Sequence, residues 1–216
     1  IEVGATGIVG GADVEPDGDP YTTDLATFRG RILFRKRNPP QGGSAADYVM
    51  WGTELSGVTR VYVERAWSGP GTVRVFPVFD EEFAAAGGIA PAERIKDVRD
   101  HIAAYAPASA AITVSAPTSL PIDVEIVGLT PDITSVREAV LAELRATFRR
   151  KGRVAGADIP VQSMPYLATP LNWSRSWIWQ AVANATGEEA HGILQPASDV
   201  TIPAGFIPVL GTVTFS

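Results

Sequence analysis

Apolar and polar residues recur along the chain with two periodicities, one helical and one extended. Helical spacing predicts a first helix from Leu25 to a cationic end at Arg35–Arg37, and further helices over about 44–56, 91–105, 135–151 and 173–185. Alternation or short apolar runs predict strands over 58–63, 72–79, 112–114, 122–126, 193–194 and 209–215. Strands and helices in this irregular order are typical of the α+β class.

This order predicts two small mixed α/β subdomains, each a short sheet covered by helices. A glycine-rich start and an acidic, proline-punctuated stretch predict a linker or the end of an upstream domain over 1–19. Leu120-Pro121 marks a further boundary. We therefore expect a central domain over 20–118 and a C-terminal domain over 119–216, with an irregular stretch over 158–172.

Local signals predict several element ends. Ser44 precedes an apolar-periodic segment and Asp47 follows three residues later, which favours an N-cap. Ser135 and Glu138 have the spacing of a capping box, and Gly152 is the predicted stop of the same helix. The residues expected to face the core on the two longest helices are Ile95, Val98 and Ile102, then Val136, Val140, Leu144 and Phe148.

Composition narrows the function classes. The formal net charge is -6 over 216 residues, and no basic run exceeds Arg149–Lys151, so a nucleic-acid footprint is not expected. No apolar stretch approaches the roughly 20 residues that span a bilayer. The chain contains no cysteine, which excludes disulfides and thiolate chemistry.

Two N-terminal patterns resemble binding loops. The glycines over 3–10 imitate a dinucleotide-binding turn, but no helix opens at the last glycine, so a connector is the better interpretation. The acidic stretch over 13–24 imitates a calcium loop, with Gly18 at the sharp turn. Pro16 and Pro20 disfavour that loop, and a solvated linker that caps the next helix is the simpler interpretation.

Catalytic and metal-ligating patterns are not evident. His101 and His191 are the two histidines, and neither stands in a zinc-binding spacing. No G-x-S-x-G elbow occurs, so a serine nucleophile is not indicated. We interpret both histidines as residues of a helix surface or a loop, and we expect no catalytic residue, cofactor or metal.

A tryptophan cluster is the strongest candidate for a contact surface. Trp173 and Trp177 are four residues apart and are expected to lie together on one helix, near Arg175 and Trp179. Core packing explains such a cluster equally well. Tryptophan and arginine are also enriched at interface hot spots, so we predict these four residues as a protein interface.

Several longer strings carry a family resemblance. They comprise Arg35–Tyr48 (RKRNPPQGGSAADY), Gly57–Val61, Gly69–Val73 and, before the first helix, Gly10–Asp13; near the end follow Pro196–Val200, Pro203–Gly205 and Val209–Val213. Together these strings resemble the baseplate J-like family of contractile phage tails and related particles. The resemblance runs in order over nearly the whole chain, although the segment 164–180 looks longer than the family pattern.

The resemblance implies a structural wedge component of the baseplate, located in the virion tail and assembled in the host bacterial cytoplasm. It implies no enzymatic activity, and it implies assembly around the hub, with coupling of receptor engagement to sheath contraction. The implied partners are other wedge and hub proteins in a homo- or hetero-oligomeric ring. The family usually has a further N-terminal part, so we expect this chain, which begins at Ile1, to be a fragment lacking it.

A rival interpretation comes from a different class of protein. The acidic stretch over 13–24 and the tryptophan cluster also suit a calcium- or carbohydrate-binding module, or a carbohydrate-active enzyme. The quoted strings contain turn chemistry and no reactive group, which favours the structural reading.

Overall fold

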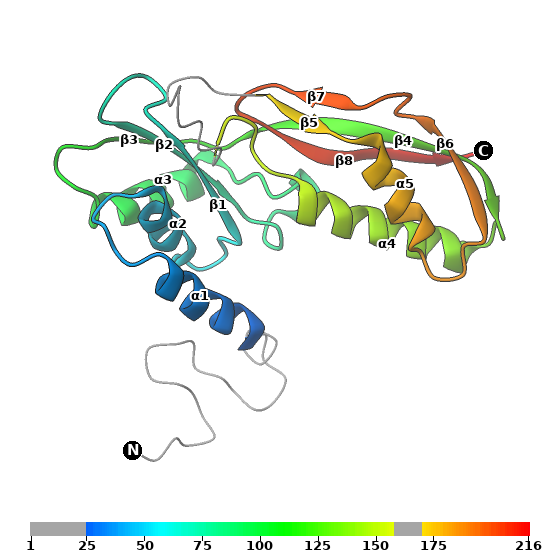
Figure 1. Ribbon diagram of the computed structural model, residues 1–216, viewed down its shortest axis with the longest axis horizontal. Coiled ribbons are helices and arrows are strands. Elements are labelled where there is room, and N and C mark those ends of the chain that lie inside the picture. The colour runs from blue at the N-terminus through cyan, green and yellow to red at the C-terminus, as the bar shows by residue number, and fades with distance from the viewer. Residues whose placement is uncertain (1–24, 158–169) are drawn as a thin grey trace, which may run out of the picture.

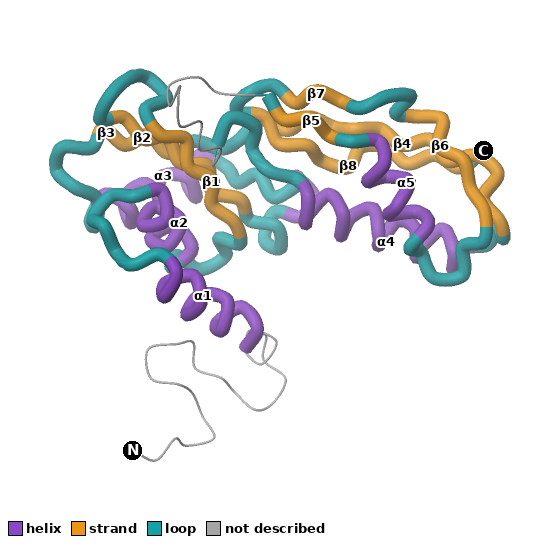
Figure 2. The backbone as a smooth tube through the Cα atoms, viewed as in Figure 1, coloured by secondary structure: helices purple, strands orange, loops and turns teal. Residues whose placement is uncertain are grey.

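The computed structural model describes residues 25–157 and 170–216, which form two halves side by side (Figure 1). Each half contains a three-stranded sheet with helices on it, and the C-terminal half has a further two-stranded ribbon, as the separation of strands and helices in Figure 2 shows. The α+β class and the short sheets covered by helices that the sequence predicts are therefore confirmed. The division at 118/119 stays a prediction.

The N-terminal half contains a three-stranded sheet in the order β1-β2-β3. Its elements are α1 (Leu25–Arg37), α2 (Ala45–Thr53), β1 (Arg60–Arg65), β2 (Thr72–Val78), the short η1 (Ala84–Ala86), α3 (Ala92–Ala103) and β3 (Ala111–Val114). Strands β1 and β2 correspond to the segments predicted as strands and form an antiparallel hairpin. Because β2 and β3 are parallel, the chain needs a crossover between them, and α3 supplies it.

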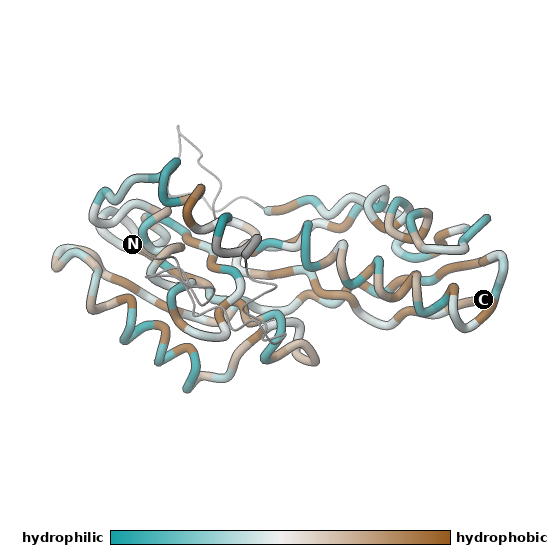
Figure 3. Tube along the Cα trace, turned by 90° about the horizontal axis from the view of Figure 1, so that it is seen from below, coloured by the Kyte–Doolittle hydropathy of each residue, from teal (hydrophilic) through white to brown (hydrophobic). Residues whose placement is uncertain are grey.

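Helices α2 and α3 cover this sheet through one apolar core. The α3 stripe of Ile95, Val98 and Ile102 is buried against Val63 and Val75 of the sheet, as the helical spacing predicts. Seen from below in Figure 3, helix turns alternate between hydrophilic and hydrophobic positions, as expected for helices that bury one face.

The C-terminal half is built around the long strand β4. Its elements are β4 (Thr118–Thr130), α4 (Thr134–Lys151), β5 (Leu171–Trp173), α5 (Arg175–Ala183), β6 (Ala190–Gln195), β7 (Val200–Ile202) and β8 (Phe206–Phe215). Strand β4 pairs antiparallel with β6 and parallel with β8, and β5 pairs with β7 in a separate ribbon. Alternate β4 residues, beginning with Ile122 and Val124, are buried under α4 and α5 as predicted.

The α4 stripe predicted from the sequence forms the centre of the second core. Val136, Val140, Leu144 and Phe148 are all buried. Phe148 stacks on Trp173, with 4.4 Å between the ring centroids, and Trp173 is fully buried. This pair ties α4 to the β5–β7 ribbon.

The two predicted helix caps have different outcomes. At α2, Ser44 accepts the Asp47 N–H and the Asp47 side chain accepts the Ser44 N–H, so this cap is confirmed as a full capping box. The capping box predicted at Ser135 and Glu138 is wrong. Helix α4 begins at Thr134 after an extended Ile133, so Ser135 already lies inside the first turn and cannot cap it.

Two further differences concern lengths and boundaries. Helix α2 ends at Thr53, earlier than predicted. The helix predicted over 173–185 begins only at Arg175. Trp173 belongs to β5 and pairs with Val200 of β7, and Ser174 caps α5. The short elements β5, β7 and η1 carry too few residues to show a periodicity, and pattern analysis missed them. No helix within the described ranges is long and apolar enough to cross a membrane.

The central position of α4 predicts a large stability loss from a single truncation there. We expect Leu144→Ala to lower the free energy of unfolding by about 2–5 kcal/mol, since it removes buried methyl groups and leaves a cavity. The matched control is Arg145→Ala, the exposed neighbour on the same helix. Equal midpoints for both variants in urea denaturation would contradict this assignment of the core.

Candidate functional site: the joint between the two halves

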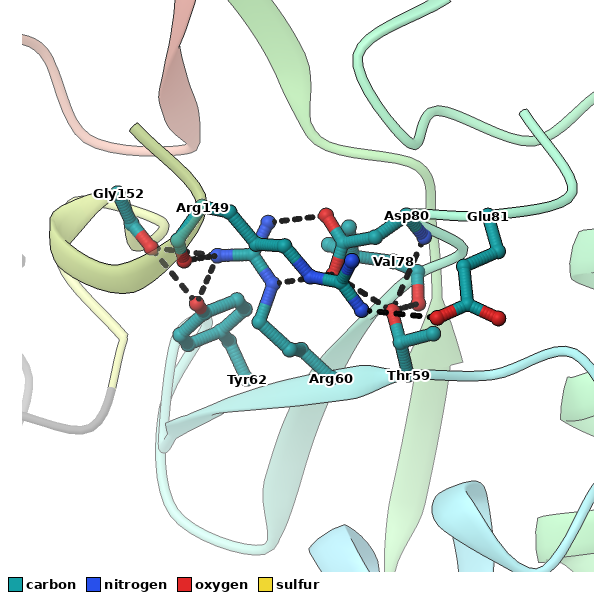
Figure 4. A network of polar contacts seen from close by, with 8 residues as sticks. All are labelled: Thr59, Arg60, Tyr62, Val78, Asp80, Glu81, Arg149 and Gly152. Carbon is teal, nitrogen blue, oxygen red and sulfur yellow. Dashed lines mark hydrogen bonds and ion pairs between the residues drawn. The ribbon is translucent and has the colours of Figure 1, made fainter. Parts of the chain in front are cut away.

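The two halves meet where the start of β1 faces the C-terminal end of α4. Arg60, the first residue of β1, reaches toward Arg149 and Gly152, while Asp80 approaches from the segment after β2 (Figure 4). We call this set of contacts, completed by Thr59, Tyr62 and Glu81, the Arg60 network. It joins residues about 90 positions apart, as the 92-residue separation of Arg60 and Gly152 shows.

The guanidinium of Arg60 makes contacts in two directions. Toward its own half, Nε lies 2.8 Å from Asp80 Oδ2 and Nη2 lies 2.7 Å from Asp80 Oδ1, which is a bidentate ion pair. Toward the other half, Nη1 donates to the carbonyls of Arg149 at 3.0 Å and Gly152 at 2.6 Å. One side chain therefore links both halves.

The carbonyl partners explain why a cation belongs here. The last carbonyls of a helix have no partner inside the helix, and the helix dipole makes this end partially negative. Arg60 satisfies two carbonyl oxygens at this end, Arg149 O in the last turn of α4 and Gly152 O at its C-cap. The hydroxyl of Tyr62 donates to Gly152 O at 2.9 Å and accepts from Arg60 Nη1 at 2.9 Å, so it completes the cap.

A second layer holds the carboxylate in place. The Asp80 backbone N–H donates to Thr59 Oγ1 at 3.0 Å, and Thr59 Oγ1 lies 2.7 Å from Asp80 Oδ2. The Arg149 side chain returns from α4, with Nη2 3.0 Å from Glu81 Oε1 and Nε 3.9 Å from Asp80 Oδ2. The joint is therefore bridged by arginines from both halves.

Burial sets the electrostatics of this pair. The side chains of Arg60 and Asp80 are 22% and 9% exposed. Burial alone lowers the pKa of Arg60, but hydrogen bonding to Asp80 and Tyr62 and the charge of Asp80 outweigh it, so the pKa lies above its ordinary value. Arg60 is permanently charged, and removing it would leave a largely buried carboxylate without its main partner.

Apolar packing accompanies the polar network. A small buried cluster combines Phe76 and Val78 of β2 with Val154 and Ala157 after α4 and Ile207 of β8. The joint therefore contains apolar side chains that are buried from water beside the Arg60 network.

A glycine marks how close the two halves come. Gly87 has φ +66°, and a Cβ built on it would lie 2.7 Å from Val209 Cγ1 of β8. Only glycine fits there without strain or displacement of Val209.

The bend between α1 and α2 is fixed by one buried carboxylate. Asp47 Oδ2 accepts the backbone N–H groups of Gln41 at 3.1 Å, Gly43 at 2.9 Å and Ser44 at 2.9 Å. Burial raises the pKa of Asp47, but these N–H bonds together with the Ser44 hydroxyl lower it overall. Because Asp47 is 2% exposed, this bond set holds the segment 41–44, and with it the start of α2, in one conformation.

The predicted tryptophan interface is divided by the structure. Trp173 lies in β5 and is fully buried, so the prediction that it shares a helix with Trp177 is wrong, although the two rings still meet edge to face at 5.2 Å. Trp177 is partly buried against the second core. Trp179 is 38% exposed, and Arg175 lies 5.8 Å from its ring centroid and donates to Ile193 O. An interface role for these residues stays a prediction.

The two histidines occupy structural positions. The prediction that His191 lies on a helix surface or in a loop is wrong. This residue lies in β6 with a side chain only 5% exposed, and its Nδ1 is 2.7 Å from Glu188 Oε1. His101 is on α3, 3.7 Å from Glu54 and next to Tyr105.

The remaining sequence motifs give no site within the described part of the chain. The glycine pattern over 3–10 and the acidic pattern over 13–24 lie outside the described residues. Over 25–157 and 170–216, no three His, Asp or Glu side chains are grouped so that they could hold a metal ion.

Comparison with known proteins shows similarity to a baseplate domain and to phage and prophage proteins. Residues 40–116 match the model of the baseplate J-like central domain. The chain is 32% identical to protein JayE of Escherichia coli K12 over 204 residues, which is 90% of this chain and 67% of that protein. It is 30% identical to the Mu-like prophage FluMu protein gp47 of Haemophilus influenzae and 31% identical to the baseplate protein gp47 of Escherichia phage Mu.

These alignments differ in coverage. They include 94% and 71% of this chain but only 52% and 42% of the two gp47 proteins. The chain thus spans about two thirds of JayE and about half or less of the two gp47 relatives.

Removing the Arg60 guanidinium should weaken the contact between the two halves and so lower the stability of the protein. We expect Arg60→Ala to lower the free energy of unfolding by roughly 2–4 kcal/mol, because Asp80 and two helix carbonyls lose their donor at a site that is only partly exposed. The control Arg99→Ala removes a solvent-exposed pair with Asp100, which contributes little to stability. Equal losses in urea denaturation would refute a special role for Arg60.

The Asp47 carboxylate should make stability depend on pH. Its folded-state pKa is lowered, so its contribution is complete above the unfolded-state pKa of about 3.9 and is lost as the pH falls through the lower folded-state value. The stability difference between wild type and Asp47→Asn should therefore be constant from pH 7 to about pH 5 and shrink below about pH 4. Urea titrations at each pH test this, and a difference that grows toward low pH would be the opposite of the expected sign.

Proposed function

This chain belongs to the baseplate J-like family, and from that premise we propose that it acts as a wedge subunit in the baseplate of a contractile phage tail or tail-like particle. Members of the family are structural proteins of the phage baseplate, and the chain is accordingly not an enzyme. The proposed role is to assemble around the central hub and to couple receptor engagement to sheath contraction.

The Arg60 network is the observation that best supports a coupling role. A subunit that transmits displacement between neighbours must not yield internally when one part is pushed. Here a bidentate ion pair, a helix cap and an apolar cluster fasten one half to the other within a single joint. Such a joint suits a lever that carries force from one partner to another.

The proposed partners follow from this role. We infer that other wedge and hub proteins contact the chain in a homo- or hetero-oligomeric ring. The acidic net charge of -6 disfavours a direct nucleic-acid partner. Surface contacts in such an assembly fall on exposed side chains rather than on the two cores.

Electron microscopy of the native particle tests the proposal directly. We expect the density of this chain, or of a tag fused to it, in the baseplate, as part of a ring around the hub. As a matched functional control, particles carrying Arg99→Ala should contract normally, while those carrying Arg60→Ala should assemble poorly or fail to contract. Purified particles that lack the chain, with the intact protein found only as a free monomer, would overturn the assignment.

A further inference from the structure

Helix α1 presents one exposed face that no residue of the described body covers. It extends from the N-terminal half beneath α2 (Figure 1). Most of its described side chains are exposed, and five exposed residues recur at i, i+3, i+4, i+7 and i+8, which is the spacing of a single helix face. We call this set, consisting of Arg29, Ile32, Leu33, Lys36 and Arg37, the α1 face.

The body fixes where this face points. Arg35 lies on the other side of the helix, and its Nη1 is 3.1 Å from Met50 Sδ of α2. Asn38 closes the end of the helix by donating to Phe34 O at 3.0 Å. The segment from Gln41 to Ser44, which Asp47 holds, follows directly, so the helix is attached to α2 with a defined orientation and its α1 face turned outward.

The chemistry of the α1 face defines what it fits. Ile32 and Leu33 are 50% and 39% exposed in the middle of the face. Arg29 lies before them and Lys36 and Arg37 after them, and α1 contains five cations and no anion. An apolar centre with cations at both ends complements a surface with the inverse arrangement, in which carboxylates flank apolar side chains.

We propose that the α1 face binds an acidic amphipathic helix of another subunit. Apolar side chains of that helix, spaced by three or four residues, would cover Ile32 and Leu33. Its Asp or Glu side chains would pair with Arg29, Lys36 and Arg37. The identification of the partner as a neighbouring subunit rests on the proposed baseplate function, whereas the chemistry of the face does not.

Other occupants fit the face less well. A membrane-surface helix needs a broad apolar face, and among the described side chains of α1 only Ile32 and Leu33 are large, apolar and strongly exposed. A nucleic acid needs net positive charge, and the chain carries -6. The paired apolar residues also have no role in phosphate binding.

A designed peptide can serve as the probe. It carries Leu at i, i+3, i+4 and i+7 and Glu on both flanks, is labelled with fluorescein, and is titrated with the full chain while anisotropy is recorded. We expect saturable binding that weakens as salt rises, because ion pairs contribute. The same peptide with Gln in place of Glu should bind more weakly and show little salt dependence.

Charge reversal on the chain locates the binding site. Arg29→Glu combined with Lys36→Glu should weaken peptide binding about tenfold or more, since two attractive pairs become repulsive. The control, Lys96→Glu combined with Arg99→Glu, makes the same change in net charge on exposed α3 residues and should alter binding by less than about twofold. Equal effects of the two double variants would overturn the proposal.

A second variant distinguishes the loss of apolar contact with the peptide from the loss of helical structure in α1. Leu33→Ala favours the helix, because alanine has the highest helix propensity, yet it removes the apolar centre. It should weaken peptide binding several-fold. Unchanged binding would contradict the proposal, as would comparable binding of duplex DNA or of anionic vesicles, or self-association of the chain that Leu33→Ala abolishes.

These outcomes stay distinct from those of the proposed function. If the peptide fails to bind while microscopy finds the chain in the baseplate, the α1 proposal fails and the wedge role stands. If the peptide binds as expected but the chain is absent from the particle, the wedge role fails and the peptide-binding α1 face stands.

Discussion

The contact between Arg60 and the end of α4 is the interaction on which the arrangement of the two halves depends. Each half has its own core, in which helices pack on the sheet of that half. Without the joint, the halves would be connected only through the chain itself. The Arg60 network uses the unpaired carbonyls of a helix end as its anchor, and Asp80 supplies the countercharge from the first half.

Two electrostatic interactions stabilise the Arg60 cation at this position. The helix dipole and the carboxylate both favour positive charge, and the apolar cluster beside them lowers the local dielectric and strengthens both terms. The same burial makes the network sensitive, because losing one partner leaves the others desolvated. A joint in which Arg60 contacts both halves beside an apolar cluster suits a protein that works through protein–protein contacts.

Prediction from sequence succeeded where the cause is local. The Ser44–Asp47 cap and the α3 and α4 stripes follow from residues within a few positions of each other, and the structure has them. The family resemblance carried by the strings around Pro39 and Gly69 is confirmed as well. By contrast, Trp173 has the spacing of a helix face but joins β5, because pairing with the distant β7 outweighs propensity.

The joint itself was beyond sequence reasoning. Arg60 lies in a string interpreted as strand and turn chemistry, and its partners Arg149 and Gly152 are 89 and 92 residues away. One signal was available, since an arginine and a nearby aspartate flank a hairpin of otherwise buried strands. Without knowledge of which helix end would face them, that signal does not specify a joint.

The distance between the halves tests the central claim of a stiff joint most directly. Because the chain contains no cysteine, spin labels can be placed at Lys96→Cys on α3 and Glu138→Cys on α4 without removing native thiols. Pulsed electron–electron double resonance measures the distance between the two labels. It should give a narrow distance distribution in the otherwise wild-type chain and a much broader one after Arg60→Ala. A distribution that is equally broad with and without Arg60 would contradict the account.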